Sequence, residues 1–152
     1  MREATALQAA YLVAGSLLLA FGSIAPPPPR LDGLEAAAAG LATAALLYLV
    51  LALGRAAPPR RLLVPAVAAG ASEEAVWRWG LLAGTAPYLG WVGALALSTV
   101  GFAFRHTRRD GLPAYLLLGA AFGGVFVATG QLAAAVTAHA GYNALVLIGG
   151  RR

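Results

Sequence analysis

The sequence predicts an all-α membrane protein, a polytopic bundle of about six transmembrane helices. Hydrophobic residues make up 60% of the 152 positions and charged residues only 11%, whereas roughly a quarter of the residues of a soluble domain carry charge. The apolar residues form long runs, rich in Ala and Leu, that a small globule has no room to bury. Because these runs lack the alternation of period two that a transmembrane barrel requires, we expect helices in lipid.

Six of the apolar runs are long enough to cross a membrane. A helix needs about 20 mostly apolar residues, with a range of roughly 17 to 25, to span a hydrocarbon core of about 30 Å. The predicted spans are 5–25, 34–53, 66–85, 88–105, 113–129 and 131–149. Tight turns are expected around Pro87 and Gly130. We divide the single membrane domain into residues 1–65, with two helices and their loops, and residues 66–152, a four-helix core.

The segments between the first spans contain helix breakers. The Pro26–Pro29 run cannot donate backbone hydrogen bonds and ends the first helix, and Pro58 and Pro59 lie in the segment after the second. An alternative for the first span is a secretory signal, because Arg2 precedes an apolar stretch that ends in small residues. We favour a transmembrane helix.

The positive charge is arranged as a topology signal. The net charge of +5 comes from eleven arginines, since the chain has no lysine. With six spans, one face carries nine of them: Arg2, Arg55, Arg60, Arg61, Arg105, Arg108, Arg109, Arg151 and Arg152. By the positive-inside rule this face and both termini are cytoplasmic. Because the arginines lie between apolar runs and form no single stripe, we expect no nucleic-acid partner.

A few ionisable residues interrupt the last four spans. They are Glu73, Glu74, Arg78 and His139, with His106 at the inner end of the fourth span. A charge at the centre of a bilayer costs about 2.5–3.5 kcal/mol even on insertion scales, so such groups usually face the bundle interior and mark a site.

The spacing of these residues places them on shared helix faces. Three pairs lie four residues apart: Glu74 with Arg78, Phe102 with His106, and His139 with Asn143. A rise of 1.5 Å per residue puts Glu73 about 10 Å, Asn143 about 9 Å and His139 about 15 Å from the cytoplasmic ends of their helices. We therefore expect these groups to converge on a water-accessible cavity in the cytoplasmic half of the membrane.

Each group also has a structural interpretation. Ser72 can be the N-cap of a helix, with Glu73 and Glu74 stabilising the helix dipole. Glu74 and Arg78 can form a buried ion pair with a structural role only. His106 can be an interfacial residue, and His139 and Asn143 can form hydrogen bonds between helices. The combination of all of them on successive helices favours a functional site.

In chain order these residues form the patterns EExxxR (73–78), FxxxH (102–106) and HxxxN (139–143). The three patterns resemble those of the CPBP (Abi) family of intramembrane proteases, which includes the type II CAAX prenyl proteases and bacteriocin-processing enzymes. The resemblance covers about residues 66–149. The chain departs from the family in having Trp79 between Arg78 and Gly80, where glycine often follows directly, and in having only two helices ahead of the core.

The resemblance implies an integral membrane peptidase that hydrolyses peptide bonds with water. The residues agree with this, because the chain has no cysteine and its serines form no recognisable serine–histidine–acid motif. As a hypothesis, Glu73 is the base, His106 helps to orient the water, and Glu74 is held by Arg78. His139 and Asn143 would stabilise the oxyanion. The roles of the two glutamates can also be exchanged.

The metal dependence, the substrate and the functional class of the protein stay open at this point. Glu73, His106 and His139 are candidates for a zinc site with an open water position, but the HExxH signature is absent and we expect no obligatory metal. The partners expected are the lipid bilayer and a membrane-associated peptide or protein substrate, either a prenylated C-terminus or a leader peptide. Two alternatives from other classes are a non-catalytic immunity or scaffold protein of the same fold and, less favoured, a small transporter.

Overall fold

The structure is a computed structural model that describes residues 10, 13–14, 24–56, 59–106 and 111–150. Within these residues the chain forms helices and no strand. The elements are α2 (Gly33–Leu51), the short 3₁₀-helix η1 (Arg60–Leu62), α3 (Leu63–Glu74), the π-helix η2 (Ala75–Ala83), α4 (Gly84–Arg105), α5 (Leu112–Thr129) and α6 (Leu132–Gly149). The predicted span 5–25 falls mostly outside the described residues, as do Arg2, Arg108, Arg109, Arg151 and Arg152.

In the part of the chain that the structure describes, four helices are long and apolar enough to cross a membrane. They are Gly33–Leu51, Leu63–Arg105, Leu112–Thr129 and Leu132–Gly149. The predicted helical class and the membrane-spanning character of the chain are therefore confirmed. The count of six spans and the cytoplasmic position of both termini stay predictions.

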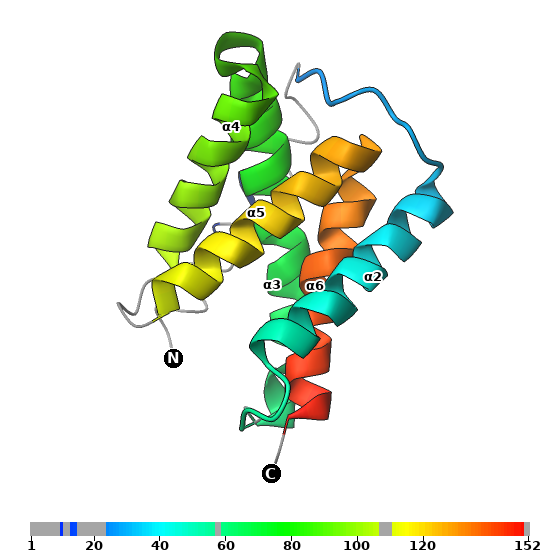
Figure 1. Ribbon diagram of the computed structural model, residues 1–152, viewed down its shortest axis with the longest axis vertical. Helices are drawn as coiled ribbons and strands as arrows, with labels where there is room; N and C mark the ends of the chain where they lie inside the picture. Colours follow the sequence, from blue (N-terminus) through cyan, green and yellow to red (C-terminus); the bar gives the residue numbers. More distant parts are fainter. Residues whose placement is uncertain (1–9, 11–12, 15–23, 57–58, 107–110, 151–152) are drawn as a thin grey trace.

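The second of these helices, 43 residues long, is folded back on itself. Arg78 Nη1 and Ser98 Oγ lie 2.7 Å apart, although 20 residues of straight helix would separate them by about 30 Å. The reversal occurs at Gly90, where φ is 68° and ψ is 165°. Figure 1 shows the resulting hairpin, in which α4 returns beside η2.

The position of this reversal corrects the predicted turn at Pro87. The helix continues past Pro87, because proline locks φ near −65°, a value that a helix accepts. Gly90 takes the positive φ that other residues adopt only with strain. The turn predicted at Gly130 is confirmed, since α5 ends there with φ of 71°.

The start of α2 is fixed by a capping box. The Asp32 side chain accepts hydrogen bonds from the backbone N–H groups of Leu34 and Glu35, and the Glu35 carboxylate accepts one from the Asp32 N–H. These bonds satisfy amide groups that the first turn of a helix leaves without partners. Asp32 and Glu35 thus have a structural role at the start of α2.

The helices alternate in direction, so that their ends gather at two levels (Figure 1). The segments that carry Arg55 and Arg105 lie at one end of the bundle, together with the end of α6, whereas the segment before α2, with Arg30, lies at the other. Arg55 and Arg105 thus lie at the opposite end of the bundle from Arg30, as expected when the arginines are assigned to two faces with six spans. Which end faces the cytoplasm stays a prediction.

Small residues allow the close packing of α2 against α6. A side chain added at Gly40 would collide with Thr137 Oγ1 and the Ala134 carbonyl oxygen. Without a hydrophobic force between helices in lipid, such close backbone approach provides much of the association energy.

We predict that Gly40→Ala lowers the free energy of unfolding by about 1–3 kcal/mol, because overpacking forces α2 and α6 apart. Gly124→Ala is the matched control, since a Cβ at Gly124 meets nothing within 4 Å and alanine raises helix propensity by about 1 kcal/mol. Denaturant unfolding in detergent micelles measures both variants. Equal stability of the two would contradict this account of the α2–α6 contact.

Candidate active site

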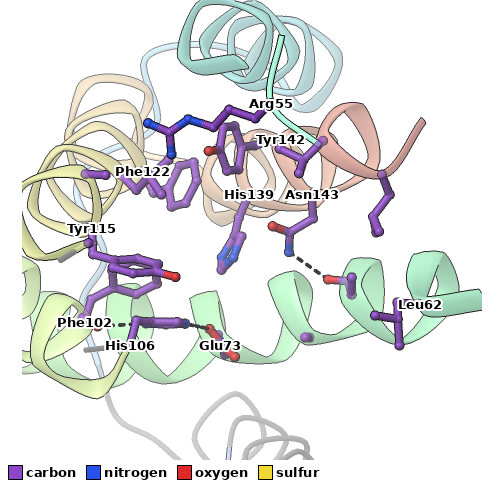
Figure 2. A pocket seen from close by; sticks show the side chains of 17 residues that line it. Arg55, Leu62, Glu73, Phe102, His106, Tyr115, Phe122, His139, Tyr142 and Asn143 are labelled. Atoms are coloured by element: carbon purple, nitrogen blue, oxygen red, sulfur yellow. Dashed lines mark hydrogen bonds and ion pairs between the residues drawn. The ribbon is translucent and has the colours of Figure 1, made fainter. Parts of the chain in front are cut away.

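A cavity of about 490 Å³ opens among α3, α5 and α6 and the end of α4. Four of the predicted site residues line it: Glu73, His106, His139 and Asn143. The rest of the lining is mainly aromatic and aliphatic and includes Arg55 and Leu62 (Figure 2). Polar groups converging in a mostly apolar cavity are the usual arrangement of a ligand site.

The two adjacent glutamates lie where α3 continues into the π-helix η2. Glu74 is the last residue of α3, and η2 begins at Ala75. π-Helical turns are rare and are frequent at functional sites. The two carboxylates diverge: the Glu73 side chain is 14% exposed and lines the cavity, whereas the Glu74 side chain is 0% exposed.

Glu73 faces His106 across the cavity floor. Glu73 Oε2 lies 3.2 Å from His106 Nε2, and Figure 2 shows both groups directed toward one another. The His106 Nδ1–H donates to the Phe102 carbonyl oxygen at 2.8 Å, which leaves Nε2 to face the carboxylate. Because a carboxylate oxygen and an unprotonated ring nitrogen are both acceptors, this contact requires a proton between them.

His106 lies one residue beyond the end of the helical span, at the C-cap of α4. Burial by itself lowers the pKa of His106, but the Glu73 carboxylate and the Phe102 carbonyl outweigh this effect and raise the pKa above its ordinary value. The direction of this shift agrees with the proton that the geometry places between His106 and Glu73.

Glu74 is the centre of a buried network. Its Oε2 accepts a hydrogen bond from Arg78 Nε at 2.7 Å, and its Oε1 lies 2.8 Å from His139 Nδ1. Arg78 Nη1 donates to Ser98 Oγ at 2.7 Å, and Ser98 Oγ donates to the Trp77 carbonyl oxygen. The network connects three elements around the Glu74 carboxylate, because Arg78 lies on η2, Ser98 on α4 and His139 on α6.

His139 is oriented by this network. With Nδ1 bonded to Glu74, its Nε2 is the ring nitrogen left for other partners. The ring also stacks on Phe122, with centroids 4.7 Å apart and an interplanar angle of 16°, and meets Phe102 edge-on.

Asn143 also reaches across to α3. Its Nδ2 donates to the Ala66 carbonyl oxygen at 2.9 Å. The interhelical hydrogen bonds considered as an alternative for His139 and Asn143 are thus present, and each joins α6 to α3. Both side chains still line the cavity.

The three candidate metal ligands do not form a coordinating set. Among the described residues no group of three His, Cys, Asp or Glu side chains is placed to hold a metal ion. Glu73 and His106 contact one another directly, and His139 contacts Glu74. We therefore derive no step through a metal.

A comparison with protein families matches residues 55–145 to the family described as type II CAAX prenyl endopeptidase Rce1-like. The match covers more than half of the 152 residues and includes every residue predicted for the site. The chain belongs to this family. No curated protein and no solved structure matches the chain significantly.

In this Rce1-like chain the structure brings the predicted residues together as two groups. One group lines the cavity and consists of Glu73, His106, His139 and Asn143. The other is the buried pair of Glu74 and Arg78, in which Glu74 contacts His139. Sequence reasoning missed the part played by Ser98. Its spacing offered a signal, because Ser98, Phe102 and His106 recur every four residues and share one face of α4.

The aromatic shell of the site was also missed. Phe122 stacks on His139, and Tyr115 stacks on His106 with centroids 5.1 Å apart. Both residues lie on α5, whose sequence is apolar all round and carries no charge. Nothing in such a sequence distinguishes the face that meets the site from the face that meets lipid or other helices.

We predict that Arg78→Met lowers the free energy of unfolding of this Rce1-like protein by about 3–5 kcal/mol, because it leaves the buried Glu74 carboxylate without its ion-pair partner. Arg61→Met is the control, since Arg61 is exposed and a surface change of this kind falls within about 0.5 kcal/mol. Thermal unfolding in detergent tests both variants. A shift no larger for Arg78→Met than for Arg61→Met would rule out the structural role of the pair.

Proposed function

We propose that the chain is an intramembrane endopeptidase in which Glu73, assisted by His106, activates a water molecule for attack on a peptide bond. The family is one of membrane CAAX-type proteases. The observation that carries the mechanistic part is the division between the two glutamates: one lines the cavity against a histidine, and the other is buried in an ion pair.

Glu73 is the carboxylate suited to act as the base. Apart from its contact with His106, the Glu73 carboxylate has no side-chain partner among the described residues, so it has lone pairs for a water molecule. Both oxygens of Glu74 are occupied, by Arg78 and by His139. A general base must lie within hydrogen-bond reach of the proton that it takes, and only Glu73 of the pair lines the cavity.

The reaction then proceeds in two steps. The water oxygen bonds to the carbonyl carbon, one water proton passes to Glu73, and the π electrons of the carbonyl move onto its oxygen. The C–N bond then breaks, its electron pair goes to nitrogen, and the nitrogen takes the proton from Glu73. His106 holds Glu73 and the water in place through its 3.2 Å contact with the carboxylate.

His139 and Asn143 are the proposed donors to the oxyanion. Asn143 Nδ2 carries two hydrogens, of which the Ala66 carbonyl takes one. His139 donates through Nε2 when its ring carries both protons, with Nδ1 held by the Glu74 carboxylate. Glu74 and Arg78 act as positioning residues, because they reach the cavity only through His139.

The proposed substrate is a membrane-associated peptide that enters from the bundle end bearing Arg55 and Arg105, which we place on the cytoplasmic side. The apolar and aromatic lining of the cavity suits an extended peptide with apolar side chains. A prenylated CAAX C-terminus and a leader peptide are the two substrate types to compare.

We predict that Glu73→Gln and His106→Ala each lower kcat by about 10²–10⁴-fold, the contribution typical of a positioned general base and its partner. Hydrolysis of a quenched fluorescent peptide ending in a CAAX sequence, with and without a prenyl group, measures turnover in proteoliposomes. Glu35→Gln is the matched control, because glutamine also serves in the capping box at the start of α2. Full turnover by Glu73→Gln would exclude the proposed mechanism.

We also predict that chelators leave turnover within twofold of the untreated protein, and that purified protein contains no stoichiometric zinc. The physical reason is that the candidate ligands contact one another and form no coordinating group. Metal analysis and turnover after dialysis against a chelator provide the test. Inactivation that zinc reverses would show instead that the site rearranges to bind a metal.

A further inference from the structure

The strongest remaining feature is an unassigned hydroxyl in the cavity. Tyr115 lies on α5, is partly buried and lines the cavity. Figure 2 shows its hydroxyl pointing into the space between His106 and His139. Among the described residues the hydroxyl has no hydrogen-bond partner, because the contacts of Tyr115 are made by its ring.

The ring of Tyr115 packs against two neighbours, His106 and Gly111. One face stacks on His106, with centroids 5.1 Å apart and an interplanar angle of 21°. A Cβ added at Gly111 would come within 2.9 Å of Tyr115 Cε2. Because the ring contacts both His106 and Gly111, packing restricts the direction of its hydroxyl.

Three other polar side chains of the cavity each have one partner already. Asn143 Nδ2 donates one hydrogen to Ala66, His139 Nδ1 is bonded to Glu74, and His106 Nε2 faces Glu73. A tetrahedral intermediate needs donors aimed at the oxygen on which charge develops. The Tyr115 hydroxyl is a donor in the described cavity whose hydrogen is not engaged by another side chain.

We propose that Tyr115 is a catalytic residue whose O–H donates a hydrogen bond to the oxyanion formed when water adds to the scissile carbonyl. This inference rests on the proposed function. The donor keeps its proton throughout: the oxyanion collapses as the C–N bond breaks, the hydrogen bond is released, and Tyr115 is unchanged after the cycle.

The first variant distinguishes the contribution of the Tyr115 hydroxyl from that of the ring. Tyr115→Phe retains the stacking on His106 and removes only the donor, so we expect kcat to fall about 10²–10³-fold with KM unchanged. Affinity for a peptide aldehyde, whose hydrate mimics the tetrahedral intermediate, should fall by a similar factor. Affinity for an uncleavable peptide of the same sequence should stay the same. Tyr88→Phe is the matched control, because Tyr88 is 86% exposed and does not line the cavity.

A second variant tests the direction of the hydroxyl. Gly111→Ala forces the ring to move, and we expect kcat to fall more than about tenfold, since small misplacements at a reacting centre are costly. Gly124→Ala, also on the α5 segment and in open space, is its control.

The outcomes are distinguishable. If Glu73→Gln is inactive while Tyr115→Phe turns over at the wild-type rate, the role of Tyr115 is overturned and the proposed function stands. If Tyr115→Phe changes KM or thermal stability and leaves kcat and aldehyde affinity unaltered, the residue is structural and the proposal is again overturned. A wild-type protein that cleaves no peptide overturns both.

Discussion

The buried contact between Glu74 and Arg78 is the interaction on which the rest of the site depends. Two full charges removed from water require excellent geometry and further hydrogen bonds, since desolvation otherwise exceeds their attraction. The protein provides both, with 2.7 Å between Arg78 Nε and Glu74 Oε2 and additional bonds to Ser98 and His139. Each added bond comes from a different helix, so the need to satisfy one buried pair also fixes the positions of α4 and α6.

This constraint explains why adjacent glutamates have different surroundings. Glu74 is committed to the ion pair and is fully buried, while Glu73, one residue earlier on α3, lines the cavity and meets His106. The π-helix begins immediately after them. A pair of carboxylates in one sequence motif thus supplies a reactive group and a positioning group, and the second orients the imidazole of His139.

The aromatic residues complete the environment of the site. Phe102, Phe122 and Tyr115 pack against the two imidazoles and leave each ring a limited range of orientations. The Arg78 guanidinium also lies over the Phe102 ring, at 5.2 Å from its centroid. In such a low-dielectric enclosure hydrogen bonds are stronger than in water, and unpaired polar groups are more costly.

The sequence by itself determined the helical class, the membrane-spanning character and four of the polar residues that line the cavity, Glu73, His106, His139 and Asn143. Apolar length and the cost of charge in lipid are local properties, and a spacing of four residues places side chains on one face whatever the surrounding fold. Only the tertiary structure decided that the hairpin reverses at Gly90, that Glu73 and not Glu74 lines the cavity, and that Tyr115 meets His106. These features depend on contacts between helices distant in the chain, and periodicity within one helix carries no information about which neighbour its apolar face will meet.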